Sequence, residues 1–168
     1  MSIDVVIKAL KQRLEPTGKL TIQRENGELL EVTCEWNNPA SEKELADFSL
    51  KTGWYLPDDY RQFLKLHNGA KIFSVWGDYF ELFDLNNIMK YYREYEIFYK
   101  GAYEKSWYMI GYYKGYGEYL FIDSEKAANN NSSYLVYVQV GDRQDLSLNF
   151  EMWFDRFIVA QGSRYWFW

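Results

Sequence analysis

Few residues of this chain could carry out bond-making chemistry. The 168 residues include one histidine, His67, and one cysteine, Cys34. A hydrolytic triad needs a histidine that takes and returns a proton, but His67 follows Tyr60 by seven residues on the apolar face of a predicted helix, where histidines are usually structural. Cys34 lies on the apolar face of a predicted strand, where a cysteine behaves as a small, inert hydrophobic residue. We therefore expect neither side chain to be catalytic.

Metal and acid chemistry have little support either. One cysteine and one histidine far apart in sequence cannot form a zinc site without carboxylates, and the chain has no H-E-x-x-H or G-x-S-x-G pattern. Asp58 and Asp59 are interpreted as acidic residues at a helix start, which the helix dipole favours, rather than as ligands. The 24 acidic residues leave catalysis by a pair of carboxylates open, because spatial separation is invisible in sequence. We expect a protein that is not an enzyme and that uses no metal and no cofactor.

The charge balance argues against nucleic acid as the partner. Nineteen Lys and Arg against 24 Asp and Glu give a net charge of −5 and an isoelectric point near 5.0, the wrong sign for holding phosphates. Residues 114–121 nearly match the RNA-recognition octamer, but Glu118 stands where a base-stacking aromatic residue is required. A basic partner fits the net charge better.

Length and composition predict one domain without a membrane segment. A chain of 168 residues is long enough for one core and too short for two. The mean hydropathy is −0.47, and no apolar run reaches the roughly 18 residues of a membrane span. A single cysteine permits no intrachain disulfide, and the first residues lack the pattern of a secretory signal, so we expect a cytoplasmic protein. The aromatic content of 20%, with 16 Tyr, indicates a surface suited to binding.

The first half of the chain predicts three helices and a hairpin. Apolar residues at helical spacing predict a helix over 3–14, which Pro16 and Gly18 end. Alternating residues on either side of Asn26-Gly27 predict two strands joined by a type I′ turn. A capping box predicts a helix after Ser41, and a third helix is expected from Pro57 to Gly69.

The second half predicts hairpins and two helices. Residues 71–76 and 79–83 are expected to pair across Gly77-Asp78, and a helix is expected from Asn86 or Asn87 to Gly101. Three further strands, 106–113, 118–123 and 133–140, precede a final helix that Asn149 caps and Gly162 ends. We expect the aromatic tail, 164–168, to pack back onto the domain, because exposed contiguous aromatic residues invite aggregation.

These elements predict an α+β fold. Helices come before and after groups of hairpin-connected strands and do not alternate with single strands, which favours a mostly antiparallel sheet of about six to seven strands. We expect the helices to pack on one face of the sheet, while the other face stays open and carries the surplus tyrosines.

The order of these motifs resembles the SUKH superfamily, the domain related to the fungal Knr-type cell-wall regulators and to Smi-type proteins. The resemblance spans residues 40–162 of a single domain, 1–168, in which 1–38 form an N-terminal helix and hairpin extension. Its core motif, which we interpret as structural, consists of Leu56, Pro57, Tyr60, Phe63, Leu64, Asn68 and Gly69.

The resemblance implies a protein that is not an enzyme. Bacterial members are commonly immunity proteins that bind and neutralise a toxin, often a nuclease, made by the same cell. Nucleases are basic because they hold phosphate, and a protein of net charge −5 would associate with one quickly. Two alternatives stay open: a regulatory interaction domain without a toxin partner, and a carbohydrate-binding domain that uses exposed aromatic side chains.

The binding surface is expected where loops extend from a rigid sheet. We predict partner contacts at the turn that carries Tyr113, Tyr116 and Glu118, and at an acidic loop with Asp142 and Asp145. The alternative interpretation is that both are ordinary solvated loops.

Overall fold

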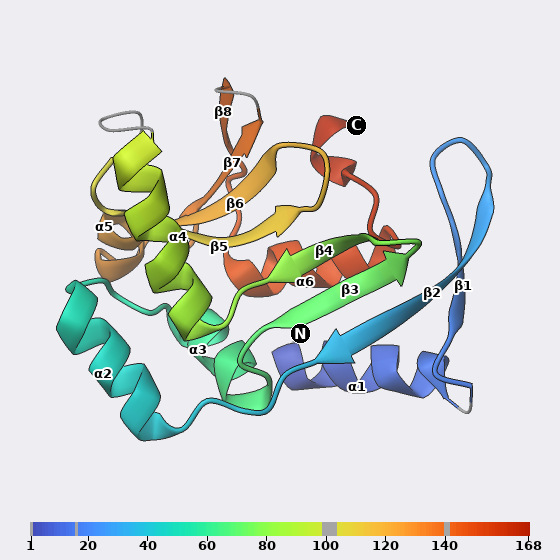
Figure 1. Ribbon diagram of the computed structural model, residues 1–168, viewed down its shortest axis with the longest axis horizontal. Coiled ribbons are helices and arrows are strands. Elements are labelled where there is room, and N and C mark those ends of the chain that lie inside the picture. The colour runs from blue at the N-terminus through green and yellow to red at the C-terminus, as the bar shows by residue number, and fades with distance from the viewer. Residues whose placement is uncertain (1, 16, 99–103, 140–141) are drawn as a thin grey trace.

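The fold is one twisted antiparallel sheet with helices against it (Figure 1). The computed structural model describes residues 2–15, 17–98, 104–139 and 142–168. The helices are α1 (Ile3–Leu14), α2 (Glu42–Thr52), α3 (Asp58–Leu66), α4 (Leu85–Phe98), α5 (Ser124–Ala128) and α6 (Phe150–Val159), followed by a short 3-10 turn, η1 (Tyr165–Phe167). The strands are β1 (Leu20–Gln23), β2 (Leu29–Trp36), β3 (Ala70–Val75), β4 (Asp78–Leu82), β5 (Trp107–Tyr113), β6 (Glu118–Asp123), β7 (Leu135–Gln139) and β8 (Asp142–Asp145).

The sheet confirms the predicted α+β class. Its strand order is β1 to β8 in sequence, and every neighbouring pair is antiparallel. The sheet has one strand more than predicted, because the acidic segment 142–145 pairs with β7 as β8. Residue 140, the predicted end of the β7 strand, lies outside the described residues.

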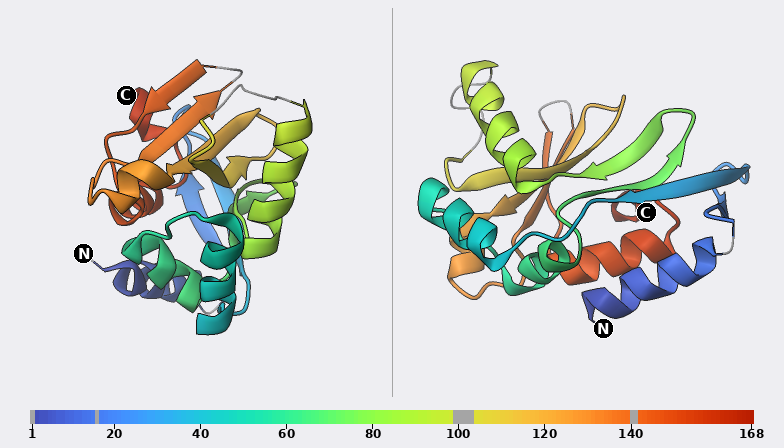
Figure 2. Two further views of the ribbon diagram at one scale, coloured as in Figure 1. Left: turned by 90° about the vertical axis from the view of Figure 1, so that its left-hand side faces the viewer. Right: turned by 60° about the horizontal axis from the view of Figure 1, so that its bottom comes forward.

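Helices lie on both faces of the sheet, which differs from the predicted one-sided arrangement. Alternate residues of a strand point to opposite faces, and the pairs Phe80–Tyr113 and Glu81–Tyr112 are neighbours in the β4–β5 register. Phe80 and Tyr113 contact Phe157 of α6, whereas Tyr112 contacts Tyr91 of α4. Figure 2 shows α6 and α1 side by side on one side of the sheet and α4 on the other.

A large part of the core lies between the sheet and α6. Asn149 caps α6 through a hydrogen bond from the Met152 amide, as predicted. The apolar stripe of α6 is fully or nearly fully buried, and Trp153 stacks on Phe157 with ring centroids 5.1 Å apart. Aromatic pairs of this kind add stability beyond the area they bury.

Two hairpin turns differ from their predictions. In the β1–β2 hairpin Gln23 pairs with Leu29, and only Gly27 of the loop has a positive φ, so the connection is longer than a two-residue type I′ turn. In the β3–β4 hairpin Val75 pairs with Asp78, so the turn residues are Trp76 and Gly77 rather than Gly77 and Asp78. Both turn residues have positive φ, 49° and 90°, which suits the twist of a tight hairpin.

Side chains cap the starts of α2 and α4, and at α4 the capping residue differs from the predicted one. Ser41 and Glu44 form the predicted capping box of α2. The Asp84 carboxylate accepts a hydrogen bond from the Asn87 amide at 2.8 Å, so Asp84 rather than Asn86 or Asn87 satisfies the start of α4. The predicted end of this helix, Gly101, lies outside the described residues.

The predicted structural motif occupies the core around α3. Leu56, Pro57, Tyr60, Phe63 and Leu64 are buried, and the Asn68 side chain accepts a hydrogen bond from the Leu85 amide. Gly69 has a φ of +94°, and a Cβ atom there would lie 2.8 Å from the Asp84 amide nitrogen. These residues therefore hold α3, β3 and the start of α4 together.

Candidate binding site

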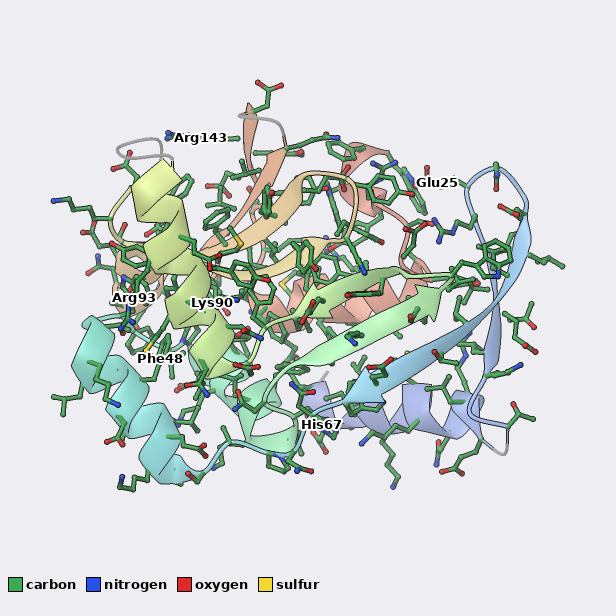
Figure 3. All side chains as sticks on the ribbon, in the orientation of Figure 1. Glu25, Phe48, His67, Lys90, Arg93 and Arg143 are labelled. Atoms are coloured by element: carbon green, nitrogen blue, oxygen red, sulfur yellow. The ribbon has the colours of Figure 1, made fainter. Side chains whose placement is uncertain are left out.

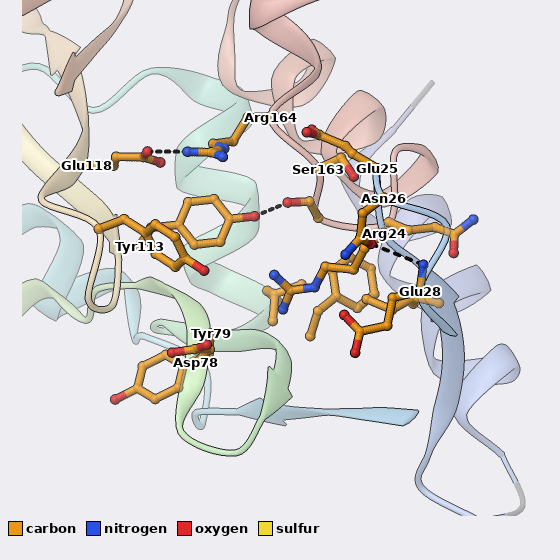
Figure 4. A pocket seen from close by; sticks show the side chains of 16 residues that line it. Arg24, Glu25, Asn26, Glu28, Asp78, Tyr79, Tyr113, Glu118, Ser163 and Arg164 are labelled. Carbon is orange, nitrogen blue, oxygen red and sulfur yellow. Dashed lines mark hydrogen bonds and ion pairs between the residues drawn. The ribbon is translucent and has the colours of Figure 1, made fainter. Parts of the chain in front are cut away.

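The described part of the chain contains a cleft of about 270 Å³ at one end of the sheet. It lies between the tips of three hairpins, β1–β2, β3–β4 and β5–β6, and the segment that follows α6 (Figure 4). Figure 3 shows Glu25 at this end of the molecule and Phe48 of α2 at the other. The sheet therefore brings segments that are far apart in sequence to one opening.

The floor of the cleft is apolar and its walls are polar. Ile22, Ile72 and Phe73 line it and are buried in the core. Tyr113 forms a wall, and its hydroxyl donates a hydrogen bond to the carbonyl oxygen of Gly162. Burial raises the pKa of Tyr113, so this donor keeps its proton at neutral pH.

The segment after α6 is fixed by close contacts. A Cβ atom at Gly162 would lie 2.8 Å from the Phe73 ring, so only glycine fits there. The neighbouring Gln161 side chain accepts a hydrogen bond from the Gln23 amide of β1 at 2.7 Å. These contacts tie the segment to strands at the opposite end of the sequence and give the cleft a fixed shape.

An ion pair with a fully buried carboxylate lines one wall of the cleft. The Glu118 side chain is 0% exposed, and its carboxylate accepts hydrogen bonds from Arg164 at 2.6 Å, from Gln139 at 3.0 Å and from the Tyr137 hydroxyl. Arg164 also lies over the Tyr116 ring, 5.6 Å from its centre. A carboxylate removed from water needs such partners, because an unpaired buried charge is strongly destabilising.

Charged side chains surround the mouth of the cleft. Arg24 is partly buried and projects into it, as Figure 4 shows. Glu25, Glu28 and Asp78 are exposed at the hairpin tips around it. The mouth therefore combines one cationic group with several anionic ones.

Exposed aromatic side chains stand beside the same opening. Trp76, at the β3–β4 turn, is 88% exposed, and Tyr116, at the β5–β6 turn, is 43% exposed. Trp168 is 79% exposed, and its indole N–H donates a 3.4 Å hydrogen bond to Glu25. The tail packs back onto the domain as predicted, since Trp166 contacts Tyr137 and Trp153, but its last residue faces solvent.

The structure brings together only part of the predicted binding set. Tyr113, Tyr116 and Glu118 all line the cleft. Glu118, however, is not an exposed acid of a turn: its carboxylate lies inside, where it pairs with Arg164 and cannot attract a partner. This burial was not visible in sequence because Arg164, Tyr137 and Gln139 are all distant along the chain.

The two other predicted acids lie elsewhere. Asp142 and Asp145 belong to the edge strand β8 rather than to a loop, and neither lines the cleft. Asp145 forms an ion pair with Lys126 at 2.6 Å. Partial burial opposes its ionisation, but the hydrogen bonds from Lys126 and the Ser147 amide hold its pKa below the ordinary value. Asp145 therefore serves the local structure.

Sequence reasoning missed Arg24, Asp78, Trp76 and Arg164. Arg24 lies near Gly27, and Trp76 and Asp78 flank Gly77. Charged and aromatic residues close to the glycine of a predicted hairpin turn could have indicated this surface. Nothing in the sequence indicated that these tips and the C-terminal segment meet.

His67, Cys34 and Asp59 have the surroundings of structural residues. His67 ends α3, and its ring nitrogens are hydrogen-bonded to Lys11 at 2.7 Å and to the Asn37 carbonyl at 2.8 Å. Burial raises the pKa of Cys34 to about 11, so its thiol is poorly nucleophilic. Asp59 accepts hydrogen bonds from Tyr134 and from the Glu151 amide, which joins α3 to the residue before β7 and to α6.

Neither a metal-binding cluster nor a membrane-spanning helix occurs among the described residues. Among residues 2–15, 17–98, 104–139 and 142–168, no group of three or more His, Cys, Asp or Glu could hold a metal ion. No helix in the same ranges is both long and apolar enough to cross a bilayer.

Comparison with known proteins gives two similar chains from Bacillus subtilis (strain 168). The uncharacterized protein YobM is 31% identical over 171 aligned residues, which cover 96% of this chain and 89% of YobM. The uncharacterized protein YnaB is 34% identical over 140 residues, which cover 81% of this chain and 88% of YnaB. The sequence pattern of the SMI1 / KNR4 family (SUKH-1), whose members are generally non-catalytic, matches residues 39–156. The chain therefore belongs to the SMI1 / KNR4 family (SUKH-1).

Proposed function

We propose that this protein is a non-enzymatic protein-binding module, and that it acts as an immunity protein that binds and neutralises a cognate toxin, often a nuclease. The observation that carries the proposal is the exposure of three aromatic side chains at the elements that form one cleft: Tyr116 lines it, Trp76 lies in the turn before the lining residue Asp78, and Trp168 is hydrogen-bonded to the lining residue Glu25. Large aromatic side chains gathered in this way mark interaction surfaces, because their burial against a partner is strongly favourable.

The geometry of the cleft suits a protein partner. Tyr and Trp are enriched among the residues that dominate binding energy, and such residues cluster around well-packed pockets. The cleft is held by the Glu118–Arg164 ion pair and by the contact between Gly162 and Phe73. A pocket with fixed walls loses little entropy on binding, which favours affinity.

The charge supports a basic partner. The chain carries a net charge of −5, and three exposed acids, Glu25, Glu28 and Asp78, stand at the mouth of the cleft. A nuclease toxin is expected to be basic because it holds phosphate. Complementary charge accelerates the association of two proteins, which helps an inhibitor that must act before its target does.

The test uses toxin neutralisation in cells. Each reading frame next to the gene is expressed under a tight promoter, and any frame that stops growth is co-expressed with this chain. We expect wild-type protein to restore colony counts and to co-purify with the toxic protein in a stoichiometric complex. A triple variant, Trp76→Ala, Tyr116→Ala and Trp168→Ala, should lose the rescue, because it removes the aromatic side chains beside the cleft.

A matched control keeps this test specific. Leu50 and Val5 are exposed apolar residues on α2 and α1, and the double variant Leu50→Ala, Val5→Ala should rescue growth as well as the wild type. Rescue by the triple variant would reject the cleft as the binding surface. Absence of any toxic neighbouring frame, with retention of the purified protein on a glycan column, would favour the carbohydrate-binding alternative instead.

A further inference from the structure

The cleft holds a cationic side chain that has no acceptor in the described part of the chain. Arg24 is partly buried and lines the cleft, yet its guanidinium forms no ion pair and no side-chain hydrogen bond with a described residue. It lies near enough to Tyr113 to lower the pKa of that hydroxyl, although burial outweighs this effect. The other arginine of the cleft, Arg164, already pairs with Glu118.

The Arg24 side chain is placed to bind a ligand that has two oxygens. The guanidinium carries five N–H donors in a planar fork that matches the two oxygens of a carboxylate. Partial burial removes some of the water molecules that would otherwise accept hydrogen bonds from these donors, which is unfavourable. A carboxylate that enters the cleft would replace the lost hydrogen-bond acceptors.

The acids around Arg24 define what may carry that carboxylate. Glu25, Glu28 and Asp78 are exposed at the mouth, and none of them forms an ion pair with a described residue. They would repel an acidic surface, and they would attract lysines or arginines placed beside the entering group. The mouth thus presents one positive group inside a ring of negative groups.

We infer that the cleft recognises an aspartate or glutamate side chain that protrudes from a basic protein surface, with the carboxylate bound by Arg24 and flanking cationic residues bound by Glu25, Glu28 and Asp78. This inference rests on the proposed protein-binding function and adds the chemistry of the contact. The apolar floor of Ile22, Ile72 and Phe73 accepts the methylene groups of the entering side chain.

This alternation of charge supplies specificity as well as attraction. A surface with only basic residues would leave Arg24 facing like charge, and a surface with only acidic residues would face the three exposed acids. Each mismatch places like charges together or leaves a buried polar group unpaired, and such penalties discriminate between partners. The pattern therefore fixes both the kind of partner and its register on the cleft.

The test is a titration of the isotope-labelled full chain with short blocked peptides, followed by nuclear magnetic resonance. The main probe is acetyl-Lys-Gly-Glu-Gly-Lys-amide. We expect it to shift the Arg24 side-chain signal together with the amides of Phe73 and Gly162. Replacing the central Glu of the probe by Gln should weaken binding about tenfold or more, because the charge-assisted hydrogen bonds are lost. Replacing both Lys of the probe by Gly should also weaken it.

Variants of the chain complete the test. Arg24→Gln should abolish binding of the main probe, and Arg24→Lys should retain only part of it, because an ammonium group cannot make the two-pronged contact. Arg13→Gln, which removes an exposed arginine at the end of α1, is the matched control and should bind as the wild type does. All variants should keep the wild-type amide spectrum outside the cleft.

Several results would overturn the inference. These are equal binding of the Glu and Gln probes, unchanged binding by Arg24→Gln, and no saturable binding at millimolar probe. Equal binding of the Gly-flanked probe would show a general carboxylate pocket rather than part of a protein interface. None of these measurements needs the natural partner. If the peptide test fails but the chain rescues growth, only the Arg24 contact is rejected. If the peptide binds as expected but no rescue is found, only the immunity function is rejected.

Discussion

The Glu118 carboxylate and the Arg164 guanidinium form an ion pair of 2.6 Å in which the carboxylate is fully buried and the arginine is about one third exposed. This pair joins β6 to the segment that follows α6. It thereby fixes one wall of the cleft. The proposed binding surface thus depends on a contact between residues 46 positions apart in sequence.

Removing the Arg164 guanidinium should destabilise the fold. Arg164→Met leaves the Glu118 carboxylate buried with only neutral hydrogen-bond donors, Tyr137 and Gln139, and should lower the free energy of unfolding by on the order of 3 kcal/mol. The double variant Glu118→Met, Arg164→Met should recover most of this loss, because no unpaired charge remains. Urea denaturation with an unchanged m-value measures both effects. A single variant as stable as the wild type would contradict the account.

Gly69 should be irreplaceable, whereas Gly53 should not. Both have positive φ, +94° and +72°, but a Cβ atom at Gly69 would lie within 2.9 Å of Leu82 and Asn37 atoms, and one at Gly53 would meet nothing within 4 Å. Gly53→Ala should therefore lower the free energy of unfolding by about 1 kcal/mol, because only the backbone conformation is unfavourable. Gly69→Ala should lower the free energy of unfolding by about 3 kcal/mol, since the steric clash adds to the backbone strain. Thermal unfolding of the two variants compares them, and equal costs would show that the close approach relaxes freely.

Stability should decrease as His67 becomes protonated. Burial, followed by the charge of Lys11, lowers the His67 pKa below its ordinary value of 6.5, although the hydrogen bond to Asn37 opposes this. The unfolded chain therefore binds the proton more readily, so the free energy of unfolding is highest above pH 6.5 and decreases as the pH falls below it. His67→Gln should flatten this part of the profile. Unfolding measured between about pH 5 and pH 8 tests it, and identical slopes in both proteins would count against a role for His67.

Cys34 should react slowly in the folded protein. Its pKa is raised from 9.0 to about 11, mainly by burial, so the thiolate fraction near pH 8 is about one hundredth of that of an ordinary cysteine. Alkylation by iodoacetamide should be slower by at least this factor in buffer than in denaturing urea, where the shift disappears. Mass spectrometry of timed samples follows the reaction. Equal rates in the two solutions would show that the thiol is accessible and ordinary.

Trp76 should be dispensable for stability. Its φ is 49°, a region in which a bulky side chain is strained, and its ring is 88% exposed. Trp76→Asn creates an Asn-Gly turn and should raise the free energy of unfolding by about 0.5–1 kcal/mol. Alanine lacks the turn preference of asparagine, so Trp76→Ala should change the free energy of unfolding little. Both variants should bind the proposed partner less well. A loss of stability with Asn would show that the tryptophan serves the fold rather than binding.

The helices and turns were predictable because their signals are local. The capping box of Ser41 and Glu44 and the apolar stripe of α6 lie within one or two helical turns of the residues they organise. Turn residues were found less accurately. The glycine at position 77 indicated a hairpin, but its register, set by the pairing of Val75 with Asp78, differs by one residue from the prediction.

By itself, the sequence determined the α+β class, the main helices and the family to which the chain belongs, because spacing, caps and apolar periodicity act between residues close along the chain. Only the tertiary structure decided which charges are free to bind. Glu118 became an internal partner of Arg164, while Arg24, Tyr116 and Asp78 came together at one cleft. Burial and ion pairing depend on contacts between distant segments, and those contacts form only when the eight strands are assembled in register.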